Sequence, residues 1–539
     1  MIFNKNWKLY IMLGGGKPQW TFLQHNGPMF PPEYKPHRKP IIVNGKEIIL
    51  TPLAEEYATM YAKFLDTDYI NNSKFNKNFW LDFKPTITNY DIDNLQSIDF
   101  SIIKKYLDEQ KQKKLNLTKE EKINIKNKQD KLEQPYKFCI IDGTQQQVGN
   151  FKIEPPGIFL GRGDHPKIGR IKKRITYKDV TINLSKDAKI PDGDWGEVIN
   201  DNSVIWLATW VEEITGKNKY IFTSLDSFFK SKSDEDKFDL AKQLKKKANS
   251  IREDYEKQLF DDIEKNRQLA TALYFIDNFA LRVGTSKDKK ETADTVGVTS
   301  LRVEHLILLD NNVIKLDFLG KDSVRYCKKV AVHNQVYNNL KEFIRDKKNK
   351  NELFDKINAN MLNDYLNSFL EGLTAKVWRT YNASLLFQKE LDKIKEDKLE
   401  NIDENERLNY LIAMFNQANT AVALLCNHQK SNTSSIDNII EKFNNKLKEL
   451  KKKKRKYEES KNYDKVKKIK SKIMSLKIKK DTKEKMKNVS LGTSKNNYID
   501  PRIIFAFIKK YNIPPDKLFT QNLIKRFEWA SNVNSDYRF

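Results

Sequence analysis

The sequence predicts a multidomain α+β protein, and three observations predict this fold class. Its 539 residues can bury a sizeable core and form roughly two to four domains. Short strand-like runs mix with helices up to about residue 220, whereas the region 234–432 is mainly helical with one strand-rich insert. From 431 to 488 the composition changes to lysine-rich helices with narrow apolar stripes, which indicates a separate segment.

The first region opens with a predicted hairpin. The run 41–50 turns at an Asn-Gly pair, which is typical of tight β-turns. Thr51 is then a predicted N-cap with Pro52 at the first helical position, so we expect a helix to about Asp66. The stretch 103–132 is helical, highly charged and poor in large apolar groups, so we expect it to stand in solvent or to follow DNA.

The second region combines a helix with a small sheet. Residues 268–283 carry apolar side chains at helical spacing and end at Gly284, where we expect the helix to stop. Three apolar runs separated by turns follow within 305–327 and predict a three-stranded meander. The second turn, 320–323, carries Lys321 at its tip.

The third region predicts two helices that fold back on each other. Its apolar stripes, 436–450 and 463–476, are separated by a helix-weak Ser-Lys-Asn sequence, which favours an antiparallel coiled coil. Such a hairpin buries little surface, so we expect a mobile arm. The basic run 451–456 is more typical of a solvated face than of a DNA contact.

The C-terminal region predicts a helix that begins beside a tyrosine. Asp500 followed by Pro501 predicts an N-cap and a first helical residue, and an apolar stripe continues to Ile508. Tyr498 lies just ahead of this N-terminus, where backbone N–H groups favour an anion. Its phenol could attack a phosphodiester and hold the product covalently. Taken alone, however, the segment is better explained by a packed tyrosine.

The composition favours a polyanionic partner. A net charge of +26 and a pI near 9.4 attract nucleic acid first and an anionic membrane second. No stretch approaches 18 uninterrupted apolar residues, and the first residues do not form a secretory signal. Cys139, Cys327 and Cys426 are widely scattered, so neither a disulfide framework nor a zinc site is expected.

Four further residues could support such a reaction. Strand cleavage needs a nucleophile, cations that neutralise the phosphorane, and a proton for the leaving oxygen. Arg282 lies at a predicted helix end and Lys321 at a hairpin tip. Arg379 follows a Lys-Val-Trp sequence, and His428 follows the predicted helix 411–425. Each of them, taken alone, is more often a surface or structural residue.

Together with Tyr498 these residues form the ordered set Arg, Lys, Arg, His, Tyr, and here the chain resembles the eukaryotic-type DNA topoisomerase I family, which is type IB. The resemblance runs from about Trp20 to Phe539, almost the whole chain. The blocks that carry it are Ala272–Gly297, Asp317–Ser323, Leu373–Ser384, Leu491–Arg502 and the cap-like Phe151–Lys167.

The resemblance implies a bilobed clamp around duplex DNA. A mixed α/β cap lobe would face a mainly helical catalytic lobe with a small antiparallel sheet, similar to tyrosine recombinases, and an antiparallel coiled coil would link this lobe to the nucleophile. The implied domains are a short N-terminal extension (1–19), the cap lobe (20–227), the catalytic lobe (228–431), the linker (432–489) and the C-terminal domain (490–539).

The resemblance also implies roles. Tyr498 would attack a DNA phosphate, leaving a 3′-phosphotyrosine and a free 5′-hydroxyl. Arg282, Arg379 and His428 would bind the non-bridging oxygens, and Lys321 would protonate the leaving 5′-oxygen. Rotation of the free strand end would relax supercoiled DNA before religation.

No cofactor is implied. The phosphotyrosine conserves the bond energy, so the reaction needs neither ATP nor an obligatory metal, with Mg²⁺ at most a stimulating ion. The sequence agrees with this expectation, because it contains no G-x-x-x-x-G-K-[ST] loop and no H-E-x-x-H motif.

Further DNA contacts are implied on both lobes. Arg162, Asp322 and Asn497 align with residues that surround the cleaved step and the camptothecin-type poison site in the family. An equally good interpretation is that Asp322 caps its turn and Asn497 orients the neighbouring backbone. Leu160 stands where members often carry an arginine, so one upstream phosphate contact is in doubt. The full set of predicted DNA contacts is Arg162, Lys167, Lys173, Arg174, Asp322, Lys376, Asn497 and Lys495.

The implied setting is a monomeric nuclear enzyme of DNA replication and transcription that binds double-stranded DNA and no membrane. The long charged N-terminal tail of the family is essentially absent, which removes the usual place for nuclear import signals and leaves a viral or organellar setting open. Two other functions stay open: a tyrosine site-specific recombinase, and a catalytically inactive DNA-binding relative.

Overall fold

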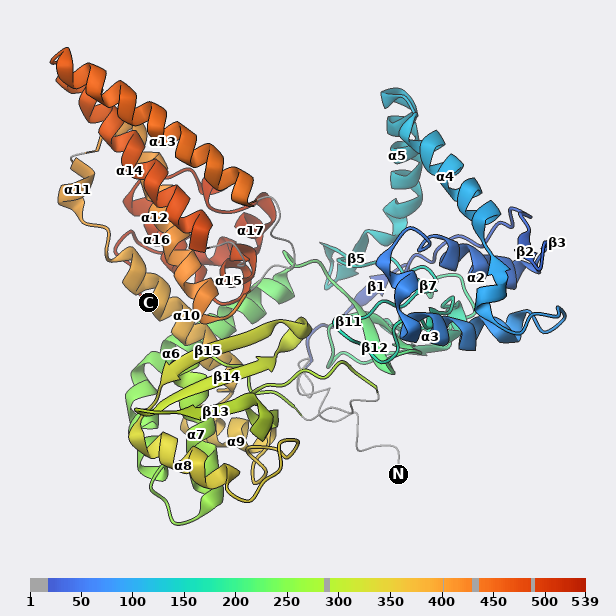
Figure 1. Ribbon diagram of the computed structural model, residues 1–539, viewed down its shortest axis with the longest axis horizontal. Coiled ribbons are helices and arrows are strands. Elements are labelled where there is room, and N and C mark those ends of the chain that lie inside the picture. Colours follow the sequence, from blue (N-terminus) through green and yellow to red (C-terminus); the bar gives the residue numbers. More distant parts are fainter. Residues whose placement is uncertain (1–17, 286–290, 401, 429–435, 486–489) are drawn as a thin grey trace. The chain divides into compact units, whose positions relative to one another are not determined.

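The computed structural model (Figure 1) describes residues 18–539 apart from 286–290, 401, 429–435 and 486–489. The chain divides into two compact units, Met1–Lys230 with Lys287–Asp294, and Ser231–Ser286 with Thr295–Phe539. Both contain helices and small sheets, which confirms the mixed fold class. None of the helices in the described ranges has the length and apolar character needed to span a bilayer.

The first unit contains two small β-structures around one apolar core. A three-stranded sheet has the order β1-β5-β6, and a four-stranded sheet has the order β10-β9-β11-β12. Trp20, Ile182 and Leu207 are buried between them. The strands are β1 (Leu23–His25), β5 (Phe138–Ile141), β6 (Thr144–Gln147), β9 (Thr181–Asn183), β10 (Glu197–Ile199), β11 (Trp206–Glu212) and β12 (Lys217–Phe222).

A second core of the first unit is aromatic. The predicted hairpin at the Asn-Gly turn is present, and Phe75, Phe79 and Phe83 pack beneath it with no exposed surface. The helix after Thr51 is shorter than expected and ends at Ala62. The elements are β2 (Ile41–Val43), β3 (Lys46–Ile48), β4 (Ile98–Asp99), α2 (Pro52–Ala62), α3 (Ser73–Phe83), β7 (Gly157–Ile158) and β8 (Ile171–Lys172).

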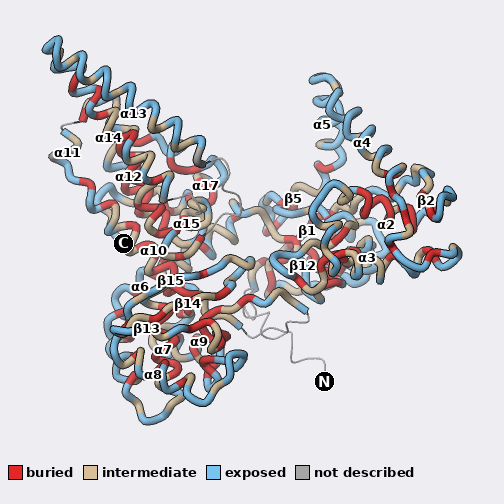
Figure 2. Tube along the Cα trace, in the orientation of Figure 1, coloured by how far each residue is buried: buried red, intermediate tan, exposed pale blue. Residues whose placement is uncertain are grey.

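The charged stretch 103–132 is helical, as expected, and consists of two helices, α4 (Ser101–Leu115) and α5 (Lys119–Glu133). Thr118 begins the second helix, because its side chain accepts from the backbone of Glu121 while the Glu121 carboxylate accepts from the backbone of Thr118. Figure 2 shows that both helices are mostly exposed along their length, as their composition predicts.

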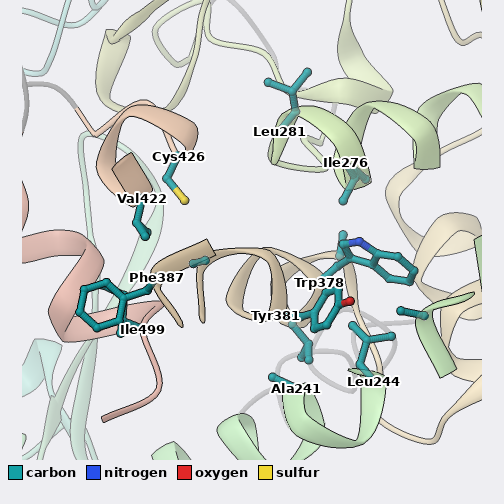
Figure 3. Packing of buried hydrophobic residues seen from close by; sticks show 14 of the residues in the cluster. Ala241, Leu244, Ile276, Leu281, Trp378, Tyr381, Phe387, Val422, Cys426 and Ile499 are labelled. Atoms are coloured by element: carbon teal, nitrogen blue, oxygen red, sulfur yellow. The ribbon is translucent and has the colours of Figure 1, made fainter. Parts of the chain in front are cut away.

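The second unit is built around α10 (Ala375–Leu391). Figure 3 shows Trp378 and Tyr381 of this helix against Ala241 and Leu244 of α6, with Ile276 of α7 nearby. Trp378 is only 2 % exposed. The other helices of the second unit as far as residue 425 are α6 (Phe228–Gln258), α7 (Glu264–Phe279), α8 (Asn334–Ile344), α9 (Ala359–Phe369), α11 (Glu396–Glu400) and α12 (Glu404–Leu425).

The predicted three-stranded meander is confirmed. Strands β13 (Leu306–Leu309), β14 (Val313–Leu319) and β15 (Arg325–Ala331) pair antiparallel in that order. The last strand continues beyond Cys327, where we expected it to end. Because Leu319 pairs with Arg325, the turn that carries Lys321 projects from the end of the sheet.

Two long helices, α13 (Ile436–Glu459) and α14 (Tyr463–Lys485), pack against each other across a short connection. The expectation that this hairpin buries little is wrong for α14, because α14 also packs along α12. Its buried Ser471 accepts from the backbone N–H of Asp403 at 3.0 Å. Tyr463, expected in the apolar stripe, is 77 % exposed.

The chain then forms three short helices, α15 (Leu491–Asn497), α16 (Pro501–Lys510) and α17 (Gln521–Arg526). The apolar face of α16 is buried in the core of the second unit. The predicted boundaries of the linker and the C-terminal domain stay predictions, because both segments lie within this unit.

Candidate active site

A cavity of about 120 Å³ in the second unit brings four of the five predicted catalytic residues together. It lies where the end of α7, the β14–β15 turn, α10 and the end of α12 meet. Arg282, Lys321, Arg379 and His428 line it, and the ring of Tyr498 lies against two of them. These residues are up to 216 positions apart in sequence (498 − 282 = 216), so the fold assembles them.

Arg282 follows a helix that ends earlier than its apolar pattern predicts. We expected a helix to Val283, but α7 ends at Phe279 and Ala280 is left-handed, with φ at +48°. This conformation is uncommon for alanine. It turns the Ala280 carbonyl toward Arg379, whose Nη1 donates to it. The chain then runs past the cavity, where the Arg282 carbonyl accepts from the Val298 N–H at 2.9 Å.

A glycine pair holds this segment to the hairpin. A Cβ on Gly297 would lie 2.5 Å from Gly284 Cα and 2.7 Å from the Arg282 carbonyl oxygen. The N–H of the preceding residue, Val296, donates to the Leu319 carbonyl at 2.8 Å. The backbone at Gly297 therefore lies between the Arg282 segment and the Lys321 hairpin and hydrogen-bonds to both through its neighbours. We refer to Arg282–Gly284 and Val296–Thr299 as the glycine bracket.

Lys321 projects from a tight turn. Asp322 and Ser323 both have positive φ, at +66° and +59°, and the Gly320 N–H donates to the Val324 carbonyl at 2.8 Å. The Lys321 side chain is exposed at the mouth of the cavity. The turn thus holds a flexible cation at a fixed point of the site.

Arg379 is buried, at 4 % exposure. Its Nη2 donates to the Cys426 carbonyl at 3.3 Å, and its guanidinium carbon lies 5.2 Å from the centre of the Tyr498 ring. Its Nε is buried and has no hydrogen-bond partner within the described part of the chain. A buried donor without a partner is costly, so this nitrogen is available to a ligand oxygen.

His428 is held where α12 ends. Asn427 adopts φ of +52°, and the His428 N–H donates back to the Ala423 carbonyl at 2.9 Å. The imidazole is 5 % exposed. Its Nδ1 lies 2.8 Å from Ser494 Oγ, whereas its buried Nε2 has no partner among the described residues.

The imidazole is neutral at ordinary pH. Burial lowers the pKa of His428 to about 3, and the positive charges of Arg379 and Arg282 act in the same direction. Burial also lowers the pKa of Arg282, and the charge of Arg379 adds to this effect, whereas a hydrogen bond to Tyr498 favours the charged form. Among the residues that line the cavity, Asp322 alone is acidic, so the site attracts an anion.

Tyr498 lies just ahead of α16, as predicted, and directly after the short helix α15. Asp500 caps α16 by accepting from the Arg502 N–H at 2.9 Å, and Pro501 is the first helical residue. The Ser384 hydroxyl donates to the Tyr498 carbonyl at 3.1 Å and accepts from the Asp500 N–H at 3.0 Å. The phenol ring is half-buried, with its centre 5.3 Å from that of the His428 ring.

The predicted DNA contacts of the first unit are of two kinds: exposed side chains, and side chains that bind backbone carbonyls of the same unit. Arg162 is exposed on a loop, and Lys173 is exposed and paired with Glu213 at 2.7 Å. By contrast, Lys167 donates to the Ile214 carbonyl at 2.6 Å and pairs with Glu291. Arg174 pairs with Glu56 at 2.9 Å and donates to the Pro32 carbonyl at 2.8 Å. Lys167 and Arg174 therefore also hold backbone carbonyls of the first unit, in addition to any predicted role.

The predicted contacts of the second unit divide in the same way. Lys376, Asp322 and Asn497 are exposed, and the Asn497 amide donates to the Thr493 carbonyl at 3.2 Å, which agrees with the interpretation as a backbone-orienting group. Lys495 differs, because its amine donates to the Leu518 carbonyl. Burial lowers the pKa of this amine.

Sequence reasoning did not assign a role to Ser494, Ser384 or Gly297. All three lie inside the blocks that carry the family resemblance, but nothing in the local pattern separates them from their neighbours. Their importance depends on contacts with distant residues, such as the pairing of Ser494 with a side chain 66 positions away.

No group of three or more His, Cys, Asp or Glu side chains within the described ranges could hold a metal ion. The cavity instead gathers two arginines, a lysine and a neutral imidazole around a phenol. This arrangement is typical of the class of protein that binds a phosphodiester beside a tyrosine.

Comparison with known proteins specifies the family. Profiles described as "Eukaryotic DNA topoisomerase I, DNA binding fragment", "Eukaryotic DNA topoisomerase I, catalytic core" and "C-terminal topoisomerase domain" match residues 18–223, 226–462 and 470–539. The chain therefore belongs to the eukaryotic DNA topoisomerase I family, and its function is that of a type IB DNA topoisomerase.

Individual relatives agree over nearly the whole chain. DNA topoisomerase 1 of Homo sapiens is 41% identical over 97% of this chain and 72% of the human protein. The Caenorhabditis elegans protein of the same name is 42% identical over 96% of this chain and 67% of its own length. DNA topoisomerase 1 beta of Arabidopsis thaliana is 39% identical over 98% of this chain and 60% of its own length.

Proposed function

We propose that this type IB topoisomerase relaxes supercoiled DNA by transient cleavage of one strand at Tyr498. The phenol loses its proton to solvent and its oxygen bonds to phosphorus, while the bond between phosphorus and the 5′-oxygen breaks and Lys321 protonates that oxygen. The products are a 3′-phosphotyrosine and a 5′-hydroxyl, and the reverse reaction religates the strand. The observation that carries the proposal is the convergence of Arg379 and His428 on the Tyr498 ring.

The cations of the cavity would stabilise the charge that builds on phosphorus. Arg282 and Arg379 donate in planar forks that suit two phosphate oxygens. The unpartnered Nε of Arg379 and Nε2 of His428 add two donors in the same cavity. Because these groups are already in place, little reorganisation is needed in the transition state.

Lys321 would act on the leaving group. Its turn places a cation at the mouth of the cavity, on a flexible side chain that can follow a DNA groove. The amine donates a proton to the 5′-oxygen as that oxygen leaves and takes it back during religation.

Neither ATP nor an obligatory metal has a place in this scheme, and Mg²⁺ would act only as a stimulating ion. The covalent link stores the energy of the broken bond, and the twist of the DNA drives strand rotation. Two arginines of the described site, buried Arg379 and half-buried Arg282, would supply the charge neutralisation that a metal provides in other phosphoryl-transfer enzymes.

Double-stranded DNA is the substrate. We propose that the two units close on the duplex as a clamp, with the exposed predicted contacts Arg162, Lys173 and Lys376 on its phosphates. The chain would act as a monomer in the nucleus, with the coiled-coil pair α13–α14 slowing strand rotation. Binding of a camptothecin-type poison near Asp322 and Asn497 belongs to the same proposal.

A plasmid assay tests this mechanism. Supercoiled plasmid is incubated with the enzyme in EDTA without ATP, and reactions are stopped with denaturant. We expect relaxation of positive and negative supercoils, with a trapped peptide linked to the 3′-end through residue 498. Site-specific exchange between two DNA molecules would instead support a recombinase.

Two tyrosine variants identify the nucleophile. Tyr498→Phe should abolish nicking and adduct formation but leave DNA binding nearly unchanged. Tyr326→Phe is the matched control, because Tyr326 is buried and lines the same cavity; it should keep the adduct. An adduct in the first variant, or its loss in the second alone, would reject the assignment.

A further inference from the structure

We propose that Ser494 is a positioning residue that fixes the tautomer of His428, so that the imidazole donates to the scissile phosphate through Nε2. The proposal rests on the proposed function, because it requires a phosphodiester in the cavity beside Tyr498. It assigns a task to a hydroxyl that makes no contact with the reacting atoms.

The two ring nitrogens of His428 have different surroundings. Nδ1 lies 2.8 Å from Ser494 Oγ, and the serine has no exposed surface. Nε2 is buried and without a partner in the described part of the chain, on a ring that lines the cavity. One nitrogen is therefore occupied by the serine, and the other is available to a ligand.

Hydrogen-bond accounting selects one tautomer. A neutral imidazole carries a single N–H, on one nitrogen or the other. If Nδ1 carried it, Ser494 Oγ would accept that hydrogen bond and its own hydrogen would lack an acceptor among the described side chains and backbone. The lone pair of Nε2 would also face phosphate oxygens, which offer no hydrogen. If the serine donates to Nδ1, both problems disappear, and Nε2–H is directed into the cavity.

The same serine belongs to the helix that presents the nucleophile. The Ser494 carbonyl accepts from the N–H groups of Tyr498 at 2.9 Å and Ile499 at 3.0 Å. The N–H of Ser490 donates to the His428 carbonyl at 2.7 Å. Packing of α15 against His428 thus positions the Tyr498 phenol and, through Ser494, orients the imidazole. The Nε2–H of His428 is therefore directed at the phosphate only when α15 has brought the tyrosine into the site.

Stereospecific substrates test the proposal. Cleavage is measured under single-turnover conditions on a duplex with one cleavage site, carrying either a natural phosphate or one of the two methylphosphonate diastereomers. Each diastereomer replaces one non-bridging oxygen with a methyl group. His428→Ala identifies the oxygen that the imidazole contacts, because the substrate that lacks this oxygen is insensitive to the variant.

We expect Ser494→Ala to slow cleavage of the natural phosphate about tenfold, as for loss of one neutral hydrogen bond. It should have no effect on the diastereomer that is insensitive to His428→Ala, and it should add nothing to that variant in a double mutant. Ser494→Thr, which keeps the hydroxyl, should restore most of the rate.

Ser384→Ala is the matched control. Its hydroxyl is also fully buried and holds the Tyr498 backbone, but it does not touch the imidazole. This variant should slow all three substrates by a common factor.

The proposal is overturned if Ser494→Ala leaves the natural rate unchanged, slows both diastereomers equally, or adds its full effect to His428→Ala. Equal slowing would indicate a purely structural serine. If the wild-type enzyme forms no adduct at Tyr498, the proposed function fails first; if the adduct forms and only the stereochemical pattern is missing, the serine assignment alone fails.

Discussion

At the scale of single residues, the site keeps an uncharged donor beside permanent charges. Arg282 and Arg379 remain cationic, whereas the His428 ring between Ser494 and the cavity is neutral. A neutral ring costs less to bury than an imidazolium and adds no repulsion to the two guanidinium groups. The site therefore gains a third donor without a third fixed charge.

This neutrality predicts a pH effect on stability. The unfolded chain protonates His428 near its ordinary pKa of 6.5, whereas the folded chain does so only near about 3. The unfolded state thus binds more protons between these values, and stability falls as the pH falls below 6.5. The loss is about 1.4 kcal/mol per pH unit, or about 2 kcal/mol between pH 7 and pH 5.

The measurement is the free energy of unfolding of the second unit in the wild type and in His428→Asn, by urea denaturation at both pH values. Other histidines titrate in both proteins and cancel in the comparison. The wild type should lose about 2 kcal/mol more than the variant on acidification. An equal loss in both proteins would show that the imidazole is not buried in its neutral form.

The proposed role of Lys321 as a proton donor predicts rescue by a better leaving group. Lys321→Ala should slow cleavage about 10²–10⁴-fold, the usual range for a general acid. A substrate with sulfur in place of the bridging 5′-oxygen leaves as a thiolate and needs no proton. The variant should therefore cleave this substrate at nearly the wild-type rate, whereas Arg379→Ala should stay slow. Equal defects of Lys321→Ala on both substrates would count against proton donation.

At the scale of elements, the glycine bracket connects the parts of the site. It joins the segment after α7 to the β14–β15 hairpin through the N–H of Val296 and the carbonyl of Arg282. Neither backbone could approach so closely if Gly284 or Gly297 carried a side chain. The backbone segments that carry the Arg282 guanidinium and the Lys321 amine therefore keep a fixed spacing.

The bracket predicts that one methyl group disables the site. A Cβ at residue 297 would meet backbone atoms on two sides, and backbone cannot move aside as a flexible side chain does. Gly297→Ala should therefore reduce single-turnover cleavage by at least about 10²-fold, as expected when a phosphate donor is displaced. DNA affinity should change little, because most phosphate contacts lie elsewhere.

Gly492→Ala is the matched control. It lies in α15 near the nucleophile, and a Cβ there would meet nothing within 4 Å. Cleavage by this variant should match the wild type in the same assay. Normal cleavage by Gly297→Ala would show that the glycine bracket does not set the geometry of the site.

The sequence was a good guide where the pattern is local. The meander and its lysine turn follow from alternating runs and turn residues, and the start of α16 follows from Asp500 and Pro501. The end of α7 was missed, because left-handed Ala280 is imposed by its contact with Arg379 and by the bracket. The apolar pattern of the sequence remains helical beyond Phe279, where tertiary contacts end the helix.

The residues of the site also divide into those that local sequence pattern could locate and those that it could not. The five predicted catalytic residues converge. Four of them lie in a turn or just beyond the end of a helix, where local pattern could locate them, whereas Arg379 lies within α10. The supporting hydroxyls and glycines could not be located, because Ser494 and Gly297 act on groups far away in sequence. The packing of α14 on α12 was missed for a related reason, as small polar residues such as Ser471 and Ser475 carry no amphipathic signal.

At the scale of the whole molecule, charge determines how the enzyme uses DNA. The net charge of +26 is spread over both units, whereas the reacting groups occupy one small cavity. Binding by phosphate contacts releases counterions, so affinity falls steeply with salt and depends weakly on sequence. Cleavage on bound DNA depends instead on buried groups, which salt screens much less.

This separation predicts a change in processivity with salt. For about 6–10 phosphate contacts, affinity should fall about 10³–10⁵-fold between 50 and 200 mM salt. With plasmid in excess, one enzyme at low salt should relax each plasmid completely before it dissociates, so that relaxed and untouched plasmids coexist on a gel. At higher salt it should dissociate between cleavage events, and the whole population should move through intermediate topoisomers together.

Single-turnover cleavage of saturated duplex should stay nearly constant over the same range, and Tyr498→Phe should bind duplex with the wild-type salt slope. A topoisomer distribution that does not change with salt, or a cleavage rate that falls in parallel with affinity, would show that binding and chemistry are not separated in this way.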